Sequence, residues 1–164
     1  MKKMRFPRIT LPSIVVGSSL LNNFFLLVAI LGIFVLLGHG FSPAMLWILP
    51  LTLILVGFAL GIGLVLGVMN VFLRDVGQVV PIFLQVWFWF TPIVYPENII
   101  PGAYRHWLAI NPFYHFTSAY QSILVYGKSP ELSGLFIVGI LSLILLMLSL
   151  FLFRRSSEEM VDVL

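Results

Sequence analysis

The chain has 164 residues, of which 60% are hydrophobic and only 9% are charged, and its formal net charge at pH 7 is +3. A typical soluble domain carries about 25% charged residues, so this composition excludes a soluble globular domain. Residues 9–73 contain no aspartate, glutamate, lysine or arginine. Because about 20 apolar residues cross the hydrocarbon core of a bilayer, that stretch has room for two membrane-spanning helices.

We expect an all-α integral membrane protein, because backbone groups inside a bilayer must be hydrogen-bonded within a helix or a closed barrel. The apolar stretches are continuous and do not alternate with a period of two, which disfavours a barrel. Four transmembrane helices are predicted within a transmembrane domain of residues 13–164, and they cover residues 14–37, 44–72, 78–95 and 132–153. The chain has no cysteine, which excludes disulfides and thiolate metal sites.

The basic residues predict the orientation. With a cytoplasmic N-terminus, the four spans place seven of the nine lysines and arginines in the cytoplasm, and only Arg105 and Lys128 outside. Positive charge concentrates on the cytoplasmic side of membrane proteins, so both termini are expected there. We read these charges as topology signals, and no nucleic-acid partner is expected.

An aromatic-rich region separates the third and fourth spans. Twelve of the 24 aromatic residues lie between Trp87 and Tyr126. Asn111 followed by Pro112 is typical of a helix start, and the helix that it opens, to about residue 125, would place four side chains on one face: Phe113, Phe116, Tyr120 and Leu124. A dozen residues are too few to cross the bilayer. We therefore predict a pair of short re-entrant helices on the outer side, residues 104–110 and 112–125; an aromatic belt at the interface is the alternative.

Two glycine pairs lie in the second span. Gly57 and Gly61, and likewise Gly63 and Gly67, form small-xxx-small patterns that allow another helix to approach closely. The pattern leaves open whether that helix belongs to the same chain or to a second copy.

No catalytic, metal or cofactor site is identified in the chain. Residues 127–129 (Gly-Lys-Ser) imitate the end of a phosphate-binding loop, but Ser122 stands where the loop requires its first glycine, and no strand precedes it. The three histidines lack metal-ligand spacing, and neither a nucleophile–base pair nor an intramembrane pair of acids is present.

Several stretches of the sequence are distinctive. The longest is residues 70–78 (Asn-Val-Phe-Leu-Arg-Asp-Val-Gly-Gln) with the aromatic run that follows to Pro96. The others are residues 104–112 (Tyr-Arg-His-Trp-Leu-Ala-Ile-Asn-Pro), residues 120–124 and the basic N-terminal segment, residues 3–12. Together they resemble the membrane subunit of type-2 ABC exporters for polysaccharides and polyol phosphates, such as O-antigen, capsule or teichoic acid. The resemblance covers essentially the whole chain.

The resemblance implies a permease of the bacterial cytoplasmic (inner) membrane that works as a homodimer with two separate ABC ATPase subunits. ATP and Mg²⁺ would be bound by those subunits and not by this chain. Residues 1–12 would be the cytoplasmic coupling segment that docks on the ATPase, through Lys3, Arg5, Phe6, Pro7 and Arg8. Arg74 and Asp75 would form the short cytoplasmic turn between the second and third spans.

For the substrate, the resemblance implies a lipid-linked glycan. Most of the residues that we select as candidates for the substrate path and gate are aromatic, because a flat ring packs on the apolar face of a sugar. The candidates are Trp87, Trp89, Tyr95, Tyr104, Arg105, Asn111 and Tyr120. Each aromatic side chain among them could instead anchor the protein at the lipid interface.

Members of this family are longer and begin with an amphipathic helix and further spans. We therefore expect this chain to correspond to the larger, C-terminal part of a permease, truncated at its N-terminus. Two other functions stay open at this point. One is a type-2 permease for a drug or small hydrophobic molecule, and the other is a membrane remnant or assembly protein that transports nothing.

Overall fold

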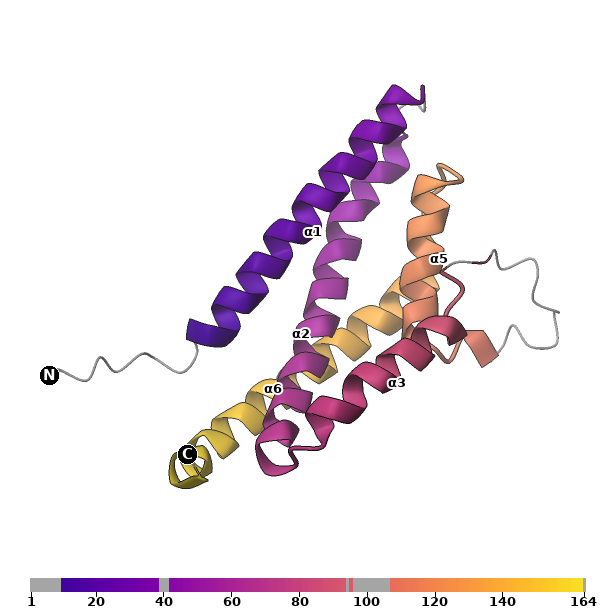
Figure 1. Cartoon of the computed structure of the whole chain (residues 1–164). Coiled ribbons are helices and arrows are strands. Elements are labelled where there is room, and N and C mark those ends of the chain that lie inside the picture. Colours follow the sequence, from indigo (N-terminus) through magenta and orange to yellow (C-terminus); the bar gives the residue numbers. More distant parts are fainter. Residues whose placement is uncertain (1–9, 39–41, 94, 96–106, 164) are drawn as a thin grey trace, which may run out of the picture. The chain divides into compact units, whose positions relative to one another are not determined.

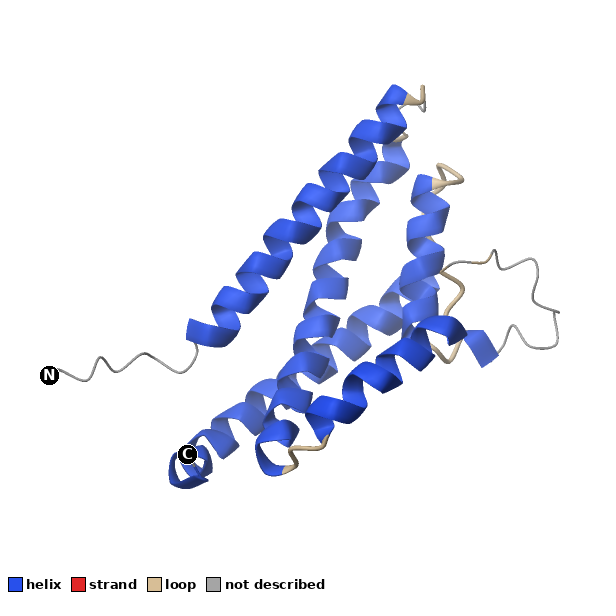
Figure 2. Cartoon of the chain, viewed as in Figure 1, coloured by secondary structure: helices blue, strands red, loops and turns tan. Residues whose placement is uncertain are grey.

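The computed structural model describes residues 10–38, 42–93, 95 and 107–163, and within these ranges it consists of helices joined by turns and loops, without a strand (Figures 1 and 2). It divides into two compact units, Met1–Phe41 and Ser42–Leu164. Three helical stretches of the described chain are long and apolar enough to cross a membrane, namely Ile14–Leu36, Pro43–Phe72 and Leu132–Arg155. The predicted all-α membrane protein is confirmed.

The first unit contains one long helix, α1 (Thr10–Leu36), over the range predicted for the first span. Its last turn closes with hydrogen bonds from Leu37 N to Ile33 O and from Gly38 N to Val35 O, both 3.0 Å. Gly38 has a φ of +78°, a conformation that glycine adopts at little cost. The helical hydrogen bonds of α1 therefore end at Gly38.

The second unit is organised around α2 (Ile48–Phe72), which follows a short 3-10 helix, η1 (Pro43–Trp47). Its main packing partner is α6 (Leu132–Val163). The two helices meet at Gly57 and Gly61, where Ser142 is buried and its hydroxyl donates to Ile54 O at 3.2 Å. One of the two predicted glycine pairs thus packs within the chain. Around Gly63 and Gly67 there is open space.

A tight turn joins α2 to α3 (Val76–Phe90). Leu73 N donates to Met69 O at 2.8 Å, and the Asn70 side-chain oxygen accepts from Gly77 N at 2.7 Å, so a side chain satisfies a backbone donor in the first turn of α3. Arg74 and Asp75 lie exposed in this turn, where the sequence placed a short polar connection.

Helix α3 ends before the predicted span does. The sequence predicts a span over residues 78–95, but the helix stops at Phe90 because Thr91 is extended, with φ −103° and ψ 132°. Pro92 explains this, since a proline disfavours helical geometry in the residue before it. At 1.5 Å per residue, 15 helical residues reach about 22 Å, less than the roughly 30 Å hydrocarbon core. The crossing of this segment stays a prediction.

Helix α5 (Pro112–Leu124) begins as predicted, with Pro112 in its first turn and the Asn111 side chain accepting from Phe113 N at 3.0 Å. None of its residues is exposed. The buried residues of α5 are Phe116, Ala119 and Ile123. Of the four side chains predicted to share one face, only Phe116 is therefore buried, and Phe113, Tyr120 and Leu124 are half-buried. Of the predicted partner helix, residues 104–106 lie outside the described residues.

Helix α6 runs to Val163, beyond the predicted span of residues 132–153. Residues 154 and 155 are both arginine, and they continue the helix in place of ending it. The polar sequence that follows still forms regular helix, so the end of the apolar stretch and the end of the helix are different positions.

The imitation of a phosphate loop at residues 127–129 has a structural explanation. Gly127 has a φ of +61°, and Lys128 N donates to Ser122 O at 2.9 Å, the arrangement by which a glycine closes the C-terminus of a helix. The Ser42 hydroxyl also donates to Gly127 O at 2.9 Å. These residues end α5 and tie it to η1.

Replacing Gly127 by alanine should lower the thermal unfolding midpoint of the purified protein, because a left-handed conformation costs an L-residue about 1–2 kcal/mol. Asparagine tolerates this conformation better, so Gly127→Asn serves as the matched control and should lose less. Equal midpoints for the alanine variant and the unchanged protein would contradict this reading of the helix end.

Candidate functional site

A row of aromatic rings connects α5 to two other helices of the second unit. Phe58 of α2 is 1% exposed, and its ring centroid lies 5.5 Å from those of both Phe113 and Phe116. Trp87 of α3 meets Phe113 edge-on at 5.1 Å, and Phe83 meets Trp87 at 5.0 Å. Edge-to-face pairs at such distances contribute beyond their buried area. The row fixes α5 between α2 and α3.

Asn111 is the polar centre beside these rings. Its side-chain oxygen accepts from Trp87 Nε1 at 3.0 Å as well as from Phe113 N, and its Nδ2 donates to Thr91 Oγ1 at 3.0 Å. The Thr91 hydroxyl in turn donates to Trp87 O at 3.1 Å, and Thr91 is 2% exposed. One asparagine therefore caps α5 and holds both the last turn of α3 and the extended residue after it.

Two further hydrogen bonds hold α5 in place. The Thr52 hydroxyl donates to Ile48 O at 2.7 Å, so the Tyr120 hydroxyl, 2.9 Å from Thr52 Oγ1, is the donor of that pair. Gln121 Nε2 donates to Pro92 O at 3.2 Å. Among the described residues no buried side-chain nitrogen or oxygen lacks a partner, which is the condition for polar groups in an apolar interior.

The structure brings together some of the candidate path and gate residues. Trp87 and Asn111 are in direct contact, and Tyr120 lies on the same helix that Asn111 caps. Trp89 is 66% exposed and belongs to the outer surface of α3, where the Tyr95 hydroxyl donates to its carbonyl oxygen at 3.3 Å. The remaining candidates, Tyr104 and Arg105, lie outside the described residues, as do the coupling residues Lys3, Arg5, Phe6, Pro7 and Arg8.

Sequence reasoning missed several members of this arrangement. Thr91 and Gln121 join the network through hydrogen bonds that depend on the end of α3, and Phe58 looks in the sequence like any other apolar residue of its span. One signal was present: Thr91 stands just before Pro92 in an otherwise apolar run. A polar residue before a helix-ending proline is a candidate for a buried polar contact.

Membrane-length apolar helices with a short, largely half-buried helix between two of them define a multi-span membrane protein. The chain belongs to the ABC-2 type transporter family, whose pattern matches residues 1–125. It is 30% identical over 166 residues to an O-antigen export system permease protein of Myxococcus xanthus, covering 98% of this chain and 62% of that relative.

Two further relatives are also named as export or transport proteins. An O-antigen export system permease protein of Klebsiella pneumoniae is 26% identical over 169 residues, with 99% of this chain and 63% of the relative covered. A polysialic acid transport protein of Escherichia coli is 27% identical over 108 residues, with 66% and 42% covered. The chain thus spans about three-fifths of the length of the O-antigen permeases that it matches.

Proposed function

We propose that this chain is the permease subunit of an ATP-driven ABC exporter that moves lipid-linked polysaccharide across the bacterial cytoplasmic membrane. One observation carries the proposal: the similarity to O-antigen export permeases extends over 98–99% of the chain. The similarity to a polysialic acid transport protein supports the same substrate class, because both names refer to glycans.

In this proposal the chain supplies the membrane path and partner subunits supply the energy. ATP and Mg²⁺ are bound by a separate ABC ATPase, and a second copy of the permease completes the path. Both termini face the cytoplasm. The support is the concentration of basic residues at the chain ends and at the turn that holds Arg74, since positive charge favours the cytoplasmic side.

The short helix α5, which packs against several other helices, suits the role of a gate. It is held to α3 through Asn111 and Trp87, and to α2 through Tyr120 and Phe58, so a shift of either helix changes the contacts of α5. Exposed aromatic rings on α3, such as Trp89, would then pack against sugar rings that pass by.

The coupling segment gives a direct test. Changing Phe6 and Arg8 together to alanine should weaken the association of the permease with its ATPase subunit by at least about tenfold, or ~1.4 kcal/mol, because an apolar contact and a charge are both lost. The measurement is co-purification of the ATPase with the permease from membranes in which both are produced.

The matched control removes a basic residue at the other end of the chain. Arg155→Ala, at an exposed position of α6, should leave co-purification unchanged. If the Phe6 and Arg8 variant retained the ATPase as fully as the unchanged protein does, residues 1–12 would not be the coupling segment.

A further inference from the structure

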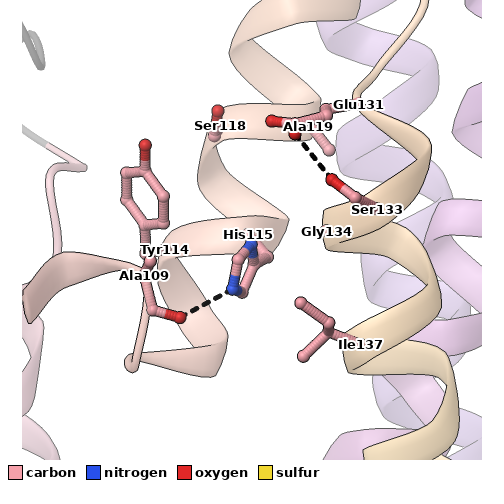
Figure 3. A pocket seen from close by; sticks show the side chains of 9 residues that line it. All are labelled: Ala109, Tyr114, His115, Ser118, Ala119, Glu131, Ser133, Gly134 and Ile137. Carbon is pink, nitrogen blue, oxygen red and sulfur yellow. Dashed lines mark hydrogen bonds between the residues drawn. The ribbon is translucent and has the colours of Figure 1, made fainter. Parts of the chain in front are cut away.

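A cleft with both polar and apolar lining lies between α5 and the first turns of α6, and its side chains are not those of the Asn111 network. It has a volume of about 290 Å³, near the lower end of the range for small-molecule sites. Figure 3 shows His115 on the α5 side, facing Gly134 and Ile137 of α6, with Glu131 and Ser133 above them. Neither the gate contacts nor the coupling segment uses these groups.

The tautomer of His115 follows from its hydrogen bond. Its Nε2 lies 2.8 Å from Ala109 O, and since a carbonyl oxygen can only accept, Nε2 carries the hydrogen. In the neutral ring Nδ1 is then an acceptor. No described residue donates to Nδ1, and the His115 side chain lines the cleft.

Gly134 makes room for this ring. A Cβ at position 134 would lie 2.8 Å from His115 Nδ1, closer than such atoms approach. The absence of a side chain there lets the imidazole, including Nδ1, approach α6 directly.

Glu131 supplies the second acceptor. One of its carboxylate oxygens accepts from the Ser133 hydroxyl at 2.6 Å, and both side chains are exposed at the start of α6. A carboxylate has about four acceptor positions, so most of its capacity remains for a ligand. Ala119 and Ile137 provide an apolar wall beside these acceptors.

The two acceptors and the apolar wall of the cleft indicate which class of ligand it can bind. The carboxylate repels phosphate and other anions, and the described residues hold no group of three His, Cys, Asp or Glu side chains able to bind a metal ion. Two acceptors beside an apolar wall match a neutral sugar, whose hydroxyls donate hydrogen bonds and whose ring carbons form an apolar face.

We propose that the cleft between α5 and α6 binds a single sugar unit, with His115 Nδ1 and the Glu131 carboxylate accepting hydrogen bonds from its hydroxyls. The choice of a sugar rests on the proposed export function and on the predicted outer position of α5. The site would hold a unit of the glycan next to the gate helix.

Binding is measured by saturation-transfer NMR with methyl α-D-glucopyranoside and methyl α-D-mannopyranoside as the probes. The protein is placed in lipid nanodiscs, because sugar-based detergents would compete. The expected result is saturation of the glycoside ring protons above that of empty nanodiscs, with binding at least about tenfold weaker in Glu131→Gln and in His115→Phe. Ser129→Ala, an exposed change near α6, should bind as the unchanged protein does.

Two results would overturn the proposal: no saturation above empty nanodiscs for either probe, or equal saturation in the unchanged protein and both cleft variants. Gly134→Ala alters neither acceptor chemically and should still reduce binding by crowding His115. The thermal midpoint of each variant shows whether it is folded.

Glycan export with an ATPase partner is measured separately. Export without glycoside binding rejects only the sugar site in the cleft, and glycoside binding without export rejects the permease function.

Discussion

Replacing Gly61 by alanine is expected to destabilise the protein by about 1–3 kcal/mol, the cost of overpacking a well-packed interior. A Cβ there would lie 2.7 Å from Leu145 Cβ and 3.0 Å from both Leu145 C and Leu146 N. Two of these three atoms belong to the backbone of α6, so no side-chain rotation relieves the contact. The thermal unfolding midpoint in detergent measures the loss.

The second glycine pair provides the control. Gly63 lies on the same helix, two residues from Gly61, and a Cβ at Gly63 meets no atom within 4 Å. Gly63→Ala should therefore leave the midpoint unchanged or raise it slightly, since alanine favours a helix more than glycine does. If the two alanine variants were equally stable, the close approach of α2 and α6 at Gly61 would be wrong.

Asn111→Ala is the second change with a large expected effect. It removes the acceptor for Trp87 Nε1 and for Phe113 N, and the donor to Thr91. Interhelical hydrogen bonds in membrane proteins contribute about 0.6 kcal/mol on average, and loss of a helix cap costs about 0.5–2 kcal/mol. Together these predict a loss of about 2 kcal/mol, measured as the shift in the unfolding midpoint.

Thr91→Val is the matched control because it keeps the shape of the side chain and removes only the hydroxyl. Its loss should be clearly smaller than that of Asn111→Ala, since the contacts of Asn111 with Trp87 and Phe113 remain. If the unfolding midpoint fell equally in both variants, the hydrogen bonds of Asn111 to Trp87 and to Phe113 N would contribute nothing to stability.

Local chemistry made part of this structure predictable. The start of α5 follows from Asn111 and Pro112, because capping depends only on neighbouring residues. The close approach at Gly57 and Gly61 was also indicated, but only the structure shows that the partner is α6. Choosing a partner for a small-residue face requires knowing which helix lies opposite, and that information is not local.

The structure differs from the sequence-based prediction where the outcome depends on backbone geometry or on distant residues. The predicted third span continued past Phe90 because hydrophobicity does, whereas Pro92 ends the helix through backbone geometry. The α6 helix continued past Arg155 because charge marks the edge of the apolar stretch and does not prevent helix formation. Asn111 was recognised as a cap, but its bonds to Trp87 and Thr91 join segments 20 to 24 residues apart in sequence.

The most direct test of the proposed export function is ATP-dependent movement of a lipid-linked polysaccharide into inverted membrane vesicles that contain this chain and the ABC ATPase proposed as its partner. The glycan is expected to become protected from externally added glycosidase when ATP is supplied, and to stay exposed with a non-hydrolysable analogue or in vesicles lacking the chain. Glycan that remains fully exposed with ATP, in vesicles where both proteins are shown to be present and associated, would contradict the proposed export function.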